Sequence, residues 1–399
     1  MNLNWLKPPF RAARTAVPET QKTQGGYGFI QMETQGAARW TRREQSALIR
    51  ESYLKNPVAY RAVRLVAEAV ADVPWTLTDE GGDVATHPLL DLLKHPNPRQ
   101  DRRTFLEALT TNLLLTGNAY VEQAGTDTSR ELHLLRPDRV TIETDATGWP
   151  VALQWKTGNA RRVVALEPDG DTPAAACHIC QYHPLDDVYG FAPLEAAAMA
   201  IDIHNGASDW NKALIDNSAR PSGALIYAPK SGANLSADQF ERLKTELQEG
   251  YQGARQAGRP LLLEGGLDWK PMGLTPKDMD FFEAKNAAAR DIALAFGVPP
   301  LMIGLPGDAT YANYKEANRA FFRLTVLPLA NRLADVLSGW LGPLYGAGLK
   351  LMADPDQVDA LAADREMLWT RIGNAAFLTE DEKREAVGYA ALQNDGGVS

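Results

Sequence analysis

Cysteine and histidine are scarce in this sequence, with 2 and 6 in 399 residues. Two thiols cannot form a disulfide framework, so we expect the chain to fold in a reducing cytoplasm. Long apolar runs are also absent, because the longest uncharged run, residues 292–307, contains three prolines and is too short to cross a bilayer. Residues 1–10 lack the apolar core of a secretory signal peptide. The sequence therefore predicts a soluble chain with no membrane contact.

Positive charge is in deficit over the whole chain. Lys plus Arg number 41 and Asp plus Glu number 50, which gives a formal net charge of −9. A protein dedicated to gripping duplex DNA normally presents a dominant basic face, so this charge argues against that class. The hydrophobic fraction of 45% is typical of a globular protein. The length suggests two or three cores, or one elongated molecule with appendages.

Residues 1–45 differ from the rest in charge and in pattern. They carry seven Lys or Arg and three Glu, a net +4, whereas the whole chain is acidic. Glycines and prolines interrupt any helical or strand period, so no packed element is required there. We expect a basic flexible N-terminal arm, which is either free in solution or anchored on another subunit by its aromatic side chains.

Apolar periodicity predicts helices before a strand-rich segment. The first predicted helix follows the cap Asn56 and ends before Pro74, and a second follows Asp101 and ends at Gly117. Between residues 118 and 182 the period changes to two, which predicts a small antiparallel sheet or barrel. Its expected strands are 119–123, 131–135, 139–143, 151–156, 161–166 and 177–182.

Two helices then bracket a compact α/β unit. They are expected over residues 193–218 and 275–296, and the second ends at Gly297. The unit between them has an expected helix over 236–252, in which Ser236 and Gln239 have capping-box form. Its expected strands are 223–227, 260–263 and 267–271.

The remaining chain is predicted to be mostly helical. A loop over residues 304–312 leads into a helix over 313–341, which Pro328 is expected to kink. Thr379 and Glu382 form a capping box at the start of a last helix, and Gly388 ends it.

The nearest approach to a metal motif is the C-x-x-C at Cys177 and Cys180, with His178 between them. This is half of a zinc site, and no second pair exists. Neighbouring residues in a strand point to opposite faces, so Cys177 points away from His178 and Cys180. We therefore expect buried, inert cysteines and no metal ligand.

Other candidate chemistry is equally incomplete. Residues 253–260 have the glycine spacing of a phosphate loop, but Arg259 replaces the lysine and Pro260 replaces the hydroxyl. The acid pairs Asp186-Asp187 and Asp278/Asp280 have no partner ligands at a fixed spacing. The sequence therefore predicts no catalytic residue and no cofactor.

A series of short motifs runs in order through residues 50–390. It comprises Asn56-Pro57-Val58, Val73-Pro74-Trp75, Thr116-Gly117-Asn118-Ala119-Tyr120, Leu134-Leu135-Arg136-Pro137-Asp138, Gly190-Phe191-Ala192-Pro193-Leu194, Ala219-Arg220-Pro221-Ser222-Gly223, Phe296-Gly297-Val298-Pro299-Pro300, Ile303-Gly304, Thr310-Tyr311-Ala312-Asn313, Leu327-Pro328 and Leu378-Thr379-Glu380-Asp381-Glu382 with Arg384. Each motif alone is weak, but their order is specific. The set resembles the portal (head–tail connector) proteins of tailed bacteriophages, in the Hong Kong 97-type branch that includes the portals of phage-derived gene transfer agents.

This resemblance implies an α+β fold with the elongated phage-portal architecture. Such an architecture has an α/β wing of helices plus antiparallel sheet, a two-helix stem, a small α/β clip and a C-terminal helical crown. The resemblance does not cover the arm at 1–45. Carried onto the rest of this chain, it gives the wing at 46–192, the stem helices at 193–220 and 274–299, the clip at 221–273, a tunnel loop and long kinked wing helix at 300–345, and the crown region at 346–399.

The resemblance also implies a non-enzymatic function. Twelve copies would form a ring at one capsid vertex of a virion or phage-like particle, assembled in the bacterial cytoplasm. Double-stranded DNA would pass through the channel during packaging and ejection. The implied partners are further copies of the chain, the DNA, the major capsid protein, the terminase large subunit and a neck or adaptor protein.

Residue roles follow from the same resemblance. The candidate residues lining the DNA channel are Lys277, Asp280, Glu283, Asp308, Thr310, Tyr311 and Asn313, and the candidate partner-binding residues of the clip are Tyr251, Arg255 and Arg259. Residues 275–299 contain three basic and four acidic side chains, a net −1. A near-neutral to acidic wall would let a polyanion slide, because phosphate contacts add affinity.

Two other functions stay open at this point. One is a metal-dependent nuclease or hydrolase of a phage-like operon, which would use the clustered acids or the Cys177 region. The other is a soluble scaffold that makes no contact with DNA. The sequence does not distinguish an infectious phage, a prophage and a gene transfer agent.

Overall fold

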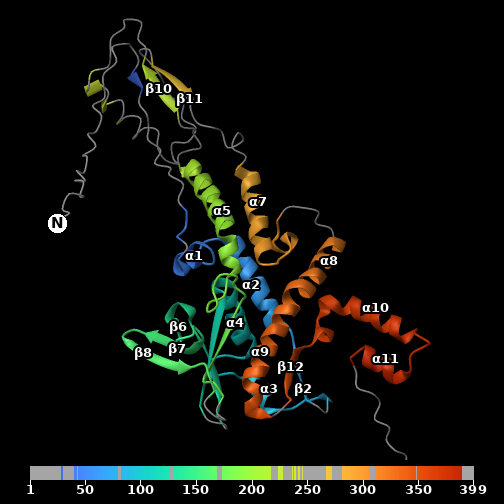
Figure 1. Ribbon diagram of the computed structural model, residues 1–399. Coiled ribbons are helices and arrows are strands. Elements are labelled where there is room, and N and C mark those ends of the chain that lie inside the picture. The colour runs from blue at the N-terminus through green and yellow to red at the C-terminus, as the bar shows by residue number, and fades with distance from the viewer. Residues whose placement is uncertain are drawn as a thin grey trace, which may run out of the picture. The chain divides into compact units, whose positions relative to one another are not determined.

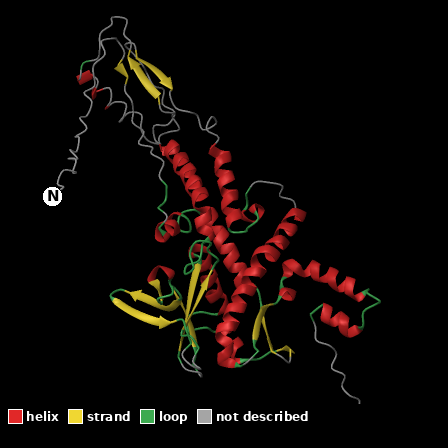
Figure 2. Ribbon diagram, viewed as in Figure 1, coloured by secondary structure: helices red, strands yellow, loops and turns green. Residues whose placement is uncertain are grey.

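A computed structural model describes residues 40–42, 44–79, 82–125, 129–168, 173–216, 281–305, 311–346 and 348–388, with shorter pieces at 28–29, 223–227, 236, 238–239, 241–242, 245 and 267–271. The chain divides into two compact units, residues 1–36 with 212–279 and residues 37–211 with 280–399. Helices are joined by small antiparallel sheets (Figure 2), which confirms the predicted α+β class. Among the described helices, none has the length and apolarity needed to cross a bilayer.

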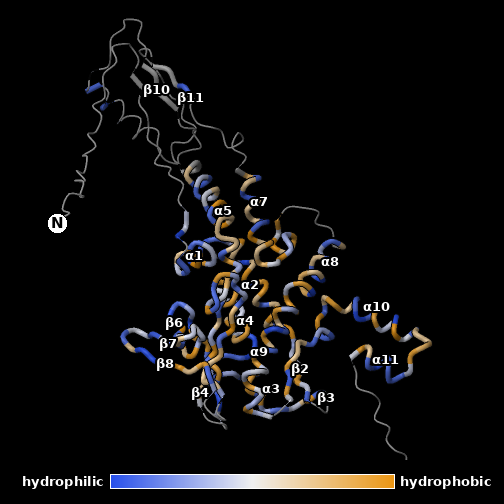
Figure 3. The backbone as a smooth tube through the Cα atoms, viewed as in Figure 1, coloured by the Kyte–Doolittle hydropathy of each residue, from blue (hydrophilic) through white to orange (hydrophobic). Residues whose placement is uncertain are grey.

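The helix α2 (Pro57–Asp72) lies at the centre of the larger unit. It starts as predicted, because the Asn56 side-chain Oδ1 accepts hydrogen bonds from the backbone N–H groups of Val58 and Ala59, both at 3.0 Å. Its buried face contains only small residues, namely Val58, Ala59, Ala62, Val63, Val66, Ala67, Val70 and Ala71. Such a face lets neighbouring helices approach closely. The interior of this unit is accordingly apolar (Figure 3).

Three other helices of the larger unit, α4, α7 and α9, pack against α2 (Figure 1). The α4 helix (Arg102–Thr116) has its predicted ends, with Asp101 accepting from the Thr104 N–H at 2.8 Å and Gly117 in the left-handed region at φ +70°. The remaining helices are α1 (Gln45–Glu51), α3 (Pro88–Lys94), α5 (Pro193–Asp216), α7 (Phe281–Ala295), α8 (Tyr311–Phe321), α9 (Leu327–Tyr345), α10 (Ala362–Gly373) and α11 (Glu380–Ala386), of which the last residues of α5 belong to the smaller unit.

The strand-rich segment forms two sheets where one sheet or barrel was predicted. The first has the order β5 (Glu131–Leu135), β4 (Asn118–Ala124), β9 (Ala176–Cys180), and the second has the order β6 (Val140–Thr144), β7 (Pro150–Thr157), β8 (Ala160–Ala165). All six strands lie within two residues of their predicted bounds. The single-sheet prediction is wrong because a 3₁₀ turn at Pro137–Arg139 separates β5 from β6, so that the consecutive strands do not pair.

A third sheet of the larger unit joins distant parts of the chain. Its order is β12 (Lys350–Ala353), β2 (Trp75–Asp79), β3 (Gly82–Asp83). The buried Leu351 pairs with the buried Leu77. Segments from both ends of the unit therefore contribute to one core, which local patterns alone did not predict.

The long helix expected over residues 313–341 is interrupted. Between α8 and α9, residues Phe322–Val326 form a π-helical turn. In a regular α-helix the ring of Pro328 would collide with the carbonyl of the residue four positions earlier, and a wider turn avoids this. The proline thus perturbs the helix where expected, and the perturbation takes the form of a π turn.

The smaller unit contains the predicted strands β10 (Gly223–Tyr227) and β11 (Leu267–Pro271). They pair antiparallel, and β1 (Gly28–Phe29) pairs with the other edge of β10. These two residues of the predicted arm therefore form a strand, which the sequence pattern did not require. Ser236 and Gln239 make both hydrogen bonds of a capping box, at 3.0 and 3.3 Å, while the strand predicted at 260–263 lies outside the described residues.

Two glycines hold β9 and the start of α5 against the end of α4. A Cβ atom built on Gly190 would lie 2.1 Å from the Gly117 carbonyl oxygen, and one on Gly117 would lie 2.3 Å from the Gly190 carbonyl oxygen. Asn118 closes the same junction, because its Oδ1 accepts from the Gly190 N–H at 2.8 Å. Any side chain at Gly190 would force two backbone segments apart.

We predict that Gly190→Ala lowers the free energy of unfolding by about 3 kcal/mol or more, because backbone atoms occupy the space of the new methyl group. The matched control is Gly206→Ala in α5, where no atom lies within 4 Å of the added Cβ. This control should raise stability by about 0.5–1 kcal/mol through lower backbone entropy in the unfolded chain. Urea unfolding followed by circular dichroism measures both, and equal effects of the two variants would contradict the prediction.

Candidate functional site

The structure describes only part of the predicted channel. Glu283 is exposed in the first turn of α7, Asn313 is exposed in the first turn of α8, and Tyr311 begins α8. The other candidate residues lie outside the described part of the chain: Lys277, Asp280, Asp308 and Thr310 for the channel, and Tyr251, Arg255 and Arg259 for the clip. The roles of all these residues, including Glu283, Tyr311 and Asn313, stay predictions.

The cap of α2 meets α5 at a buried polar junction. The Asn56 Oδ1 accepts backbone N–H groups, so its Nδ2 donates to His204 Nδ1 at 3.0 Å and to Asn205 Oδ1 at 2.9 Å. Burial lowers the pKa of His204, and the positive charge of Lys285 on α7 lowers it further. His204 and Asn205 thereby attach α5 to the start of α2, and α2 in turn packs against α7.

The end of α7 is tied to the π turn. Gly297 adopts φ +66°, and its carbonyl oxygen accepts a hydrogen bond from Thr325 Oγ1 at 2.7 Å. A 3₁₀ turn at Pro300–Ile303 follows and ends at Gly304 with φ +82°. The fixed φ of Pro299 and Pro300 makes this connection stiff. The segment that leads toward residues 306–310 therefore leaves from a rigid support.

Charges on α8 are paired with each other and with α10. Arg319 donates to Asp364 at 3.1 Å and contacts Glu316, and Arg323 lies 4.0 Å from Asp364. Exposed ion pairs of this kind contribute little to stability, but they neutralise the surface that they cover. The described part of α8 thus presents mixed charges and no basic stripe of the type that grips phosphate.

The Cys177–Cys180 segment is a structural element of β9. Burial raises the pKa of the Cys177 thiol to about 12, which makes it a poor nucleophile and metal ligand. The His178 ring stacks on the Tyr120 ring, with 4.8 Å between the ring centroids. Its Nε2 donates a hydrogen bond to Asn118 Oδ1 at 2.9 Å. Among the described residues, no group of three His, Cys, Asp or Glu side chains could hold a metal ion.

The acid pair Asp186-Asp187 lies in the loop between β9 and α5. Asp186 Oδ1 accepts from the N–H groups of Val188 and Tyr189, at 2.8 and 2.9 Å. These two bonds hold the pKa of Asp186 below its ordinary value. The carboxylate therefore shapes the loop, as an Asx turn does.

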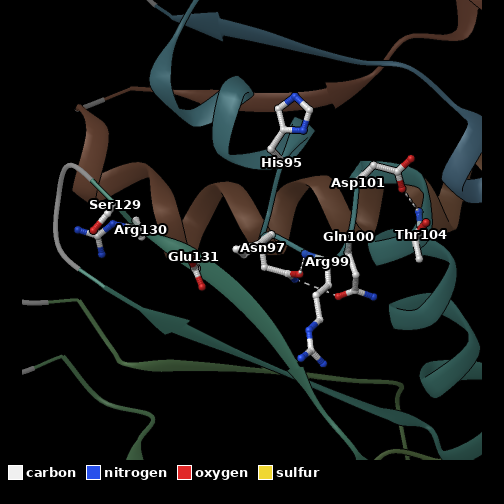
Figure 4. Close-up of a pocket in the computed structure, with 10 residues that line it drawn as sticks. His95, Asn97, Arg99, Gln100, Asp101, Thr104, Ser129, Arg130 and Glu131 are labelled. Carbon is white, nitrogen blue, oxygen red and sulfur yellow. Dashed lines mark hydrogen bonds between the residues drawn. The ribbon is translucent and has the colours of Figure 1, made fainter.

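A shallow pocket of about 650 Å³ lies beside the start of α4 (Figure 4). Its polar groups are engaged with one another, since Asn97 donates to Gln100 Oε1 and accepts from the Arg99 N–H, both at 3.0 Å. Asp101 serves as the cap of α4. The lining carries both signs of charge and no nucleophile beside a base, so it has no arrangement suited to catalysis.

A family model described as "Phage portal protein" matches residues 57–388. The chain belongs to the phage portal protein family. The fold described above and the ordered motifs of the sequence agree with this assignment, and the resemblance to portal proteins is confirmed.

Solved structures from particle necks are similar to this member of the portal family over most of its length. A chain of the structure titled "Neck of empty GTA particle computed with C6 symmetry" has a TM-score of 0.69 and 50% identity, covering 90% of this chain and 96% of that one. A chain of "Neck of native GTA particle computed with C12 symmetry" has a TM-score of 0.67 and 50% identity, covering 90% and 97%.

Curated relatives extend the comparison to other sources. An uncharacterized protein of Rickettsia bellii is 41% identical, covering 86% of this chain and 89% of its own length. The portal protein of Escherichia phage T5 is 24% identical, covering 86% and 83%. None of these four relatives is named as a nuclease or hydrolase, and nothing in them supports that alternative.

Buried neutral His178 predicts a pH dependence of stability. Burial lowers its pKa to about 4, below the ordinary value of 6.5, so the folded chain resists taking up a proton that the unfolded chain accepts. The stability that the neutral ring confers is complete above about pH 6.5 and is lost as the pH falls toward 4. We expect wild type to lose up to about 3 kcal/mol in this window.

The His178→Gln variant should lose clearly less over the same window, since glutamine does not titrate and its amide can still donate to Asn118. Urea unfolding at a series of pH values measures this difference. Parallel stability profiles for wild type and variant would show that His178 does not cause the dependence.

Proposed function

We propose that copies of this chain form the portal ring of a phage-like particle, through which double-stranded DNA enters on packaging and leaves on delivery. The observation that carries the proposal is the 50% identity to the particle-neck chain whose structure was computed with twelvefold symmetry, over 97% of that chain. A ring of twelve copies is the corresponding assembly. The identity of 50% to these gene transfer agent necks, against 24% to the T5 portal, favours a particle of the gene transfer agent type.

The proposed domains follow the order of the chain. The arm is 1–45, the wing 46–192, the stem helices 193–220 and 274–299, the clip 221–273, the tunnel loop with its long helix 300–345, and the crown region 346–399. The attachment of both α5 and α7 to α2, through Asn56 and through helix packing, supports the assignment of a two-helix stem. The rigid connection from Gly297 to Gly304 supports a loop projected from a fixed base.

The charge of the chain is better suited to letting DNA pass through a channel than to binding it tightly. Each phosphate that a protein neutralises adds affinity through counterion release, and twelve copies would multiply that affinity. A net charge of −9 per chain and the paired charges of α8 keep the affinity of the proposed channel for DNA phosphates low. In the proposed channel, Lys277, Asp280 and Glu283 of α7 and its preceding residues line the bore with Asp308, Thr310, Tyr311 and Asn313.

The proposed partners lie at both ends of the ring and around it. The clip, with Tyr251, Arg255 and Arg259, would bind the terminase large subunit during packaging and a neck or adaptor protein afterwards. The wing would contact the major capsid protein. The ring would assemble in the bacterial cytoplasm and remain at one vertex of the particle, without enzymatic activity of its own.

Assembly provides the direct test of the proposed ring. We expect the purified full-length chain to give a closed ring in negative-stain electron microscopy, with a native mass twelve times that of the 43.6 kDa chain. A neighbouring ring number would still support a portal, since the number is set by small differences in the contact angle. A protein that stays monomeric at all concentrations and salt conditions would contradict the proposal.

Channel charge gives a second prediction. The double variant Asp280→Lys with Glu283→Lys should form rings of normal mass but reduce DNA packaging or delivery by about tenfold or more, because added cations bind passing phosphates. The matched control is Asp335→Lys, which changes an exposed acid on α9, outside the proposed stem. Particle-protected DNA, measured by quantitative amplification after nuclease treatment, is the readout. Equal DNA yields from the double variant and the control would refute the channel assignment.

A further inference from the structure

The loop of residues 181–190, named here the anchor loop, is fixed at both of its ends. The Gln181 N–H donates to the Gly117 carbonyl oxygen at 2.8 Å, and the Gly190 N–H donates to Asn118 Oδ1 at 2.8 Å. Loops whose ends meet in this way and whose interior is held by its own side chains are compact, preformed surface features. The anchor loop is such a feature.

Hydrogen bonds within the anchor loop also fix its tip. Asp186 accepts from two backbone N–H groups, and the Leu185 N–H donates to His183 Nδ1 at 3.0 Å. Yet the tip displays two large apolar side chains, with Tyr182 82% exposed and Leu185 91% exposed. Preformed loops that present tyrosine and leucine to solvent suit protein contacts, because little conformational entropy is lost on binding. Asp186 and Asp187 add negative charge beside them.

The sheet β6–β7–β8 carries a surface of the opposite character. Lys156 on β7 and Arg161 on β8 are exposed and directly paired across the strands, so that two positive charges lie side by side. Like charges in this arrangement destabilise a sheet. Residues 156–162 contain no acid, and the nearby Val163 is 58% exposed. Arg162 points to the other face, where it pairs with Glu122 and lies over the Trp155 ring.

These two surfaces lie at opposite edges of one sheet. The Tyr189 hydroxyl of the anchor loop accepts from the Ile142 N–H of β6 at 3.0 Å, which fixes the loop at the β6 edge. The strand order β6–β7–β8 puts β8 at the other edge, where no further described strand pairs with it. An acidic apolar surface and a basic apolar surface at separate places on one subunit are what a head-to-tail contact between identical copies requires.

We propose that the anchor loop of one copy docks on the Lys156–Arg161–Val163 surface of the next copy. Tyr182 and Leu185 would cover Val163, while Asp187 would neutralise the paired Lys156 and Arg161. The contact rests on the proposed ring, and it defines one of the surfaces through which neighbouring copies meet. The occupant is a second copy of this chain because both halves of the complementary pair belong to it.

Cysteine cross-linking of the full-length protein tests the contact. We expect the variant Leu185→Cys with Val163→Cys, treated with a short bismaleimide, to give a ladder of covalent oligomers on a denaturing gel. Neither single variant should give a ladder beyond dimers of its own. The native cysteines Cys177 and Cys180 are both free and partly exposed, so each variant is made with these two replaced by serine, and that double-serine chain serves as the background.

A matched pair controls for chance collisions. Leu324 is 78% exposed in the π turn, away from the sheet, so Leu185→Cys with Leu324→Cys should give no ladder. Equal ladders from both pairs would overturn the proposed contact. Electron microscopy of the same samples separates the two proposals: rings without a ladder from the Leu185/Val163 pair would overturn the contact alone, whereas the absence of rings from wild type would overturn the ring and the contact with it.

Charge reversal gives an independent measurement. Asp187→Arg should weaken ring assembly by about tenfold, because three cations would then face one another across the contact. Adding Arg161→Asp to this variant should restore assembly, while Glu366→Arg on α10 should leave it unchanged. Assembly constants from mass photometry at low salt measure these effects. Failure of the second substitution to rescue the first would contradict the proposed pairing.

Discussion

α4, α7 and α9 all pack against α2, and they do so closely because α2 presents alanine and valine where they meet it. Interhelical distance depends on side-chain size at the contact, so a larger residue at Ala62 or Val66 would push several elements apart at once. The cap of the same helix, Asn56, also binds His204 and Asn205 of α5. The positions of the proposed stem helices and of the sheets thus depend on one helix of small residues and on its first turn.

Local signals in the sequence predicted most elements of the larger unit but not their pairing. Asn56, Asp101 and Gly117 mark helix ends through chemistry that acts within a few residues, and alternation located the strands to within two residues. The pairing of Leu77 with Leu351 joins segments more than 270 residues apart, and no local pattern encodes such a contact. The π turn was missed for a related reason, since Pro328 signals a perturbed helix but not the form that the backbone adopts.

The candidate site was predictable mainly through resemblance, because a conduit has no reacting groups that a spacing rule could find. Composition excluded a strongly basic binder, and the structure adds that the charges of Arg319 are paired. In the sequence, the anchor loop shows an acid pair, Asp186-Asp187, that has no partner ligands at a fixed spacing. The sequence also shows the apolar Tyr182 and Leu185 beside Asp186, a combination that suits a contact surface. Whether such a loop is fixed or loose depends on hydrogen bonds that are visible only in the structure.

The π turn between α8 and α9 also sets which sides of these helices face the core. A π turn contains one residue more than an α turn, so the side chains beyond it are offset in phase by about 100° around the axis. On α9, Ala330, Leu333 and Leu337 remain fully buried, whereas residues 312–316 of α8 are all exposed. The helix formed by α8, the π turn and α9 can therefore be exposed to solvent at its α8 end and buried in the core along α9, without an intervening loop.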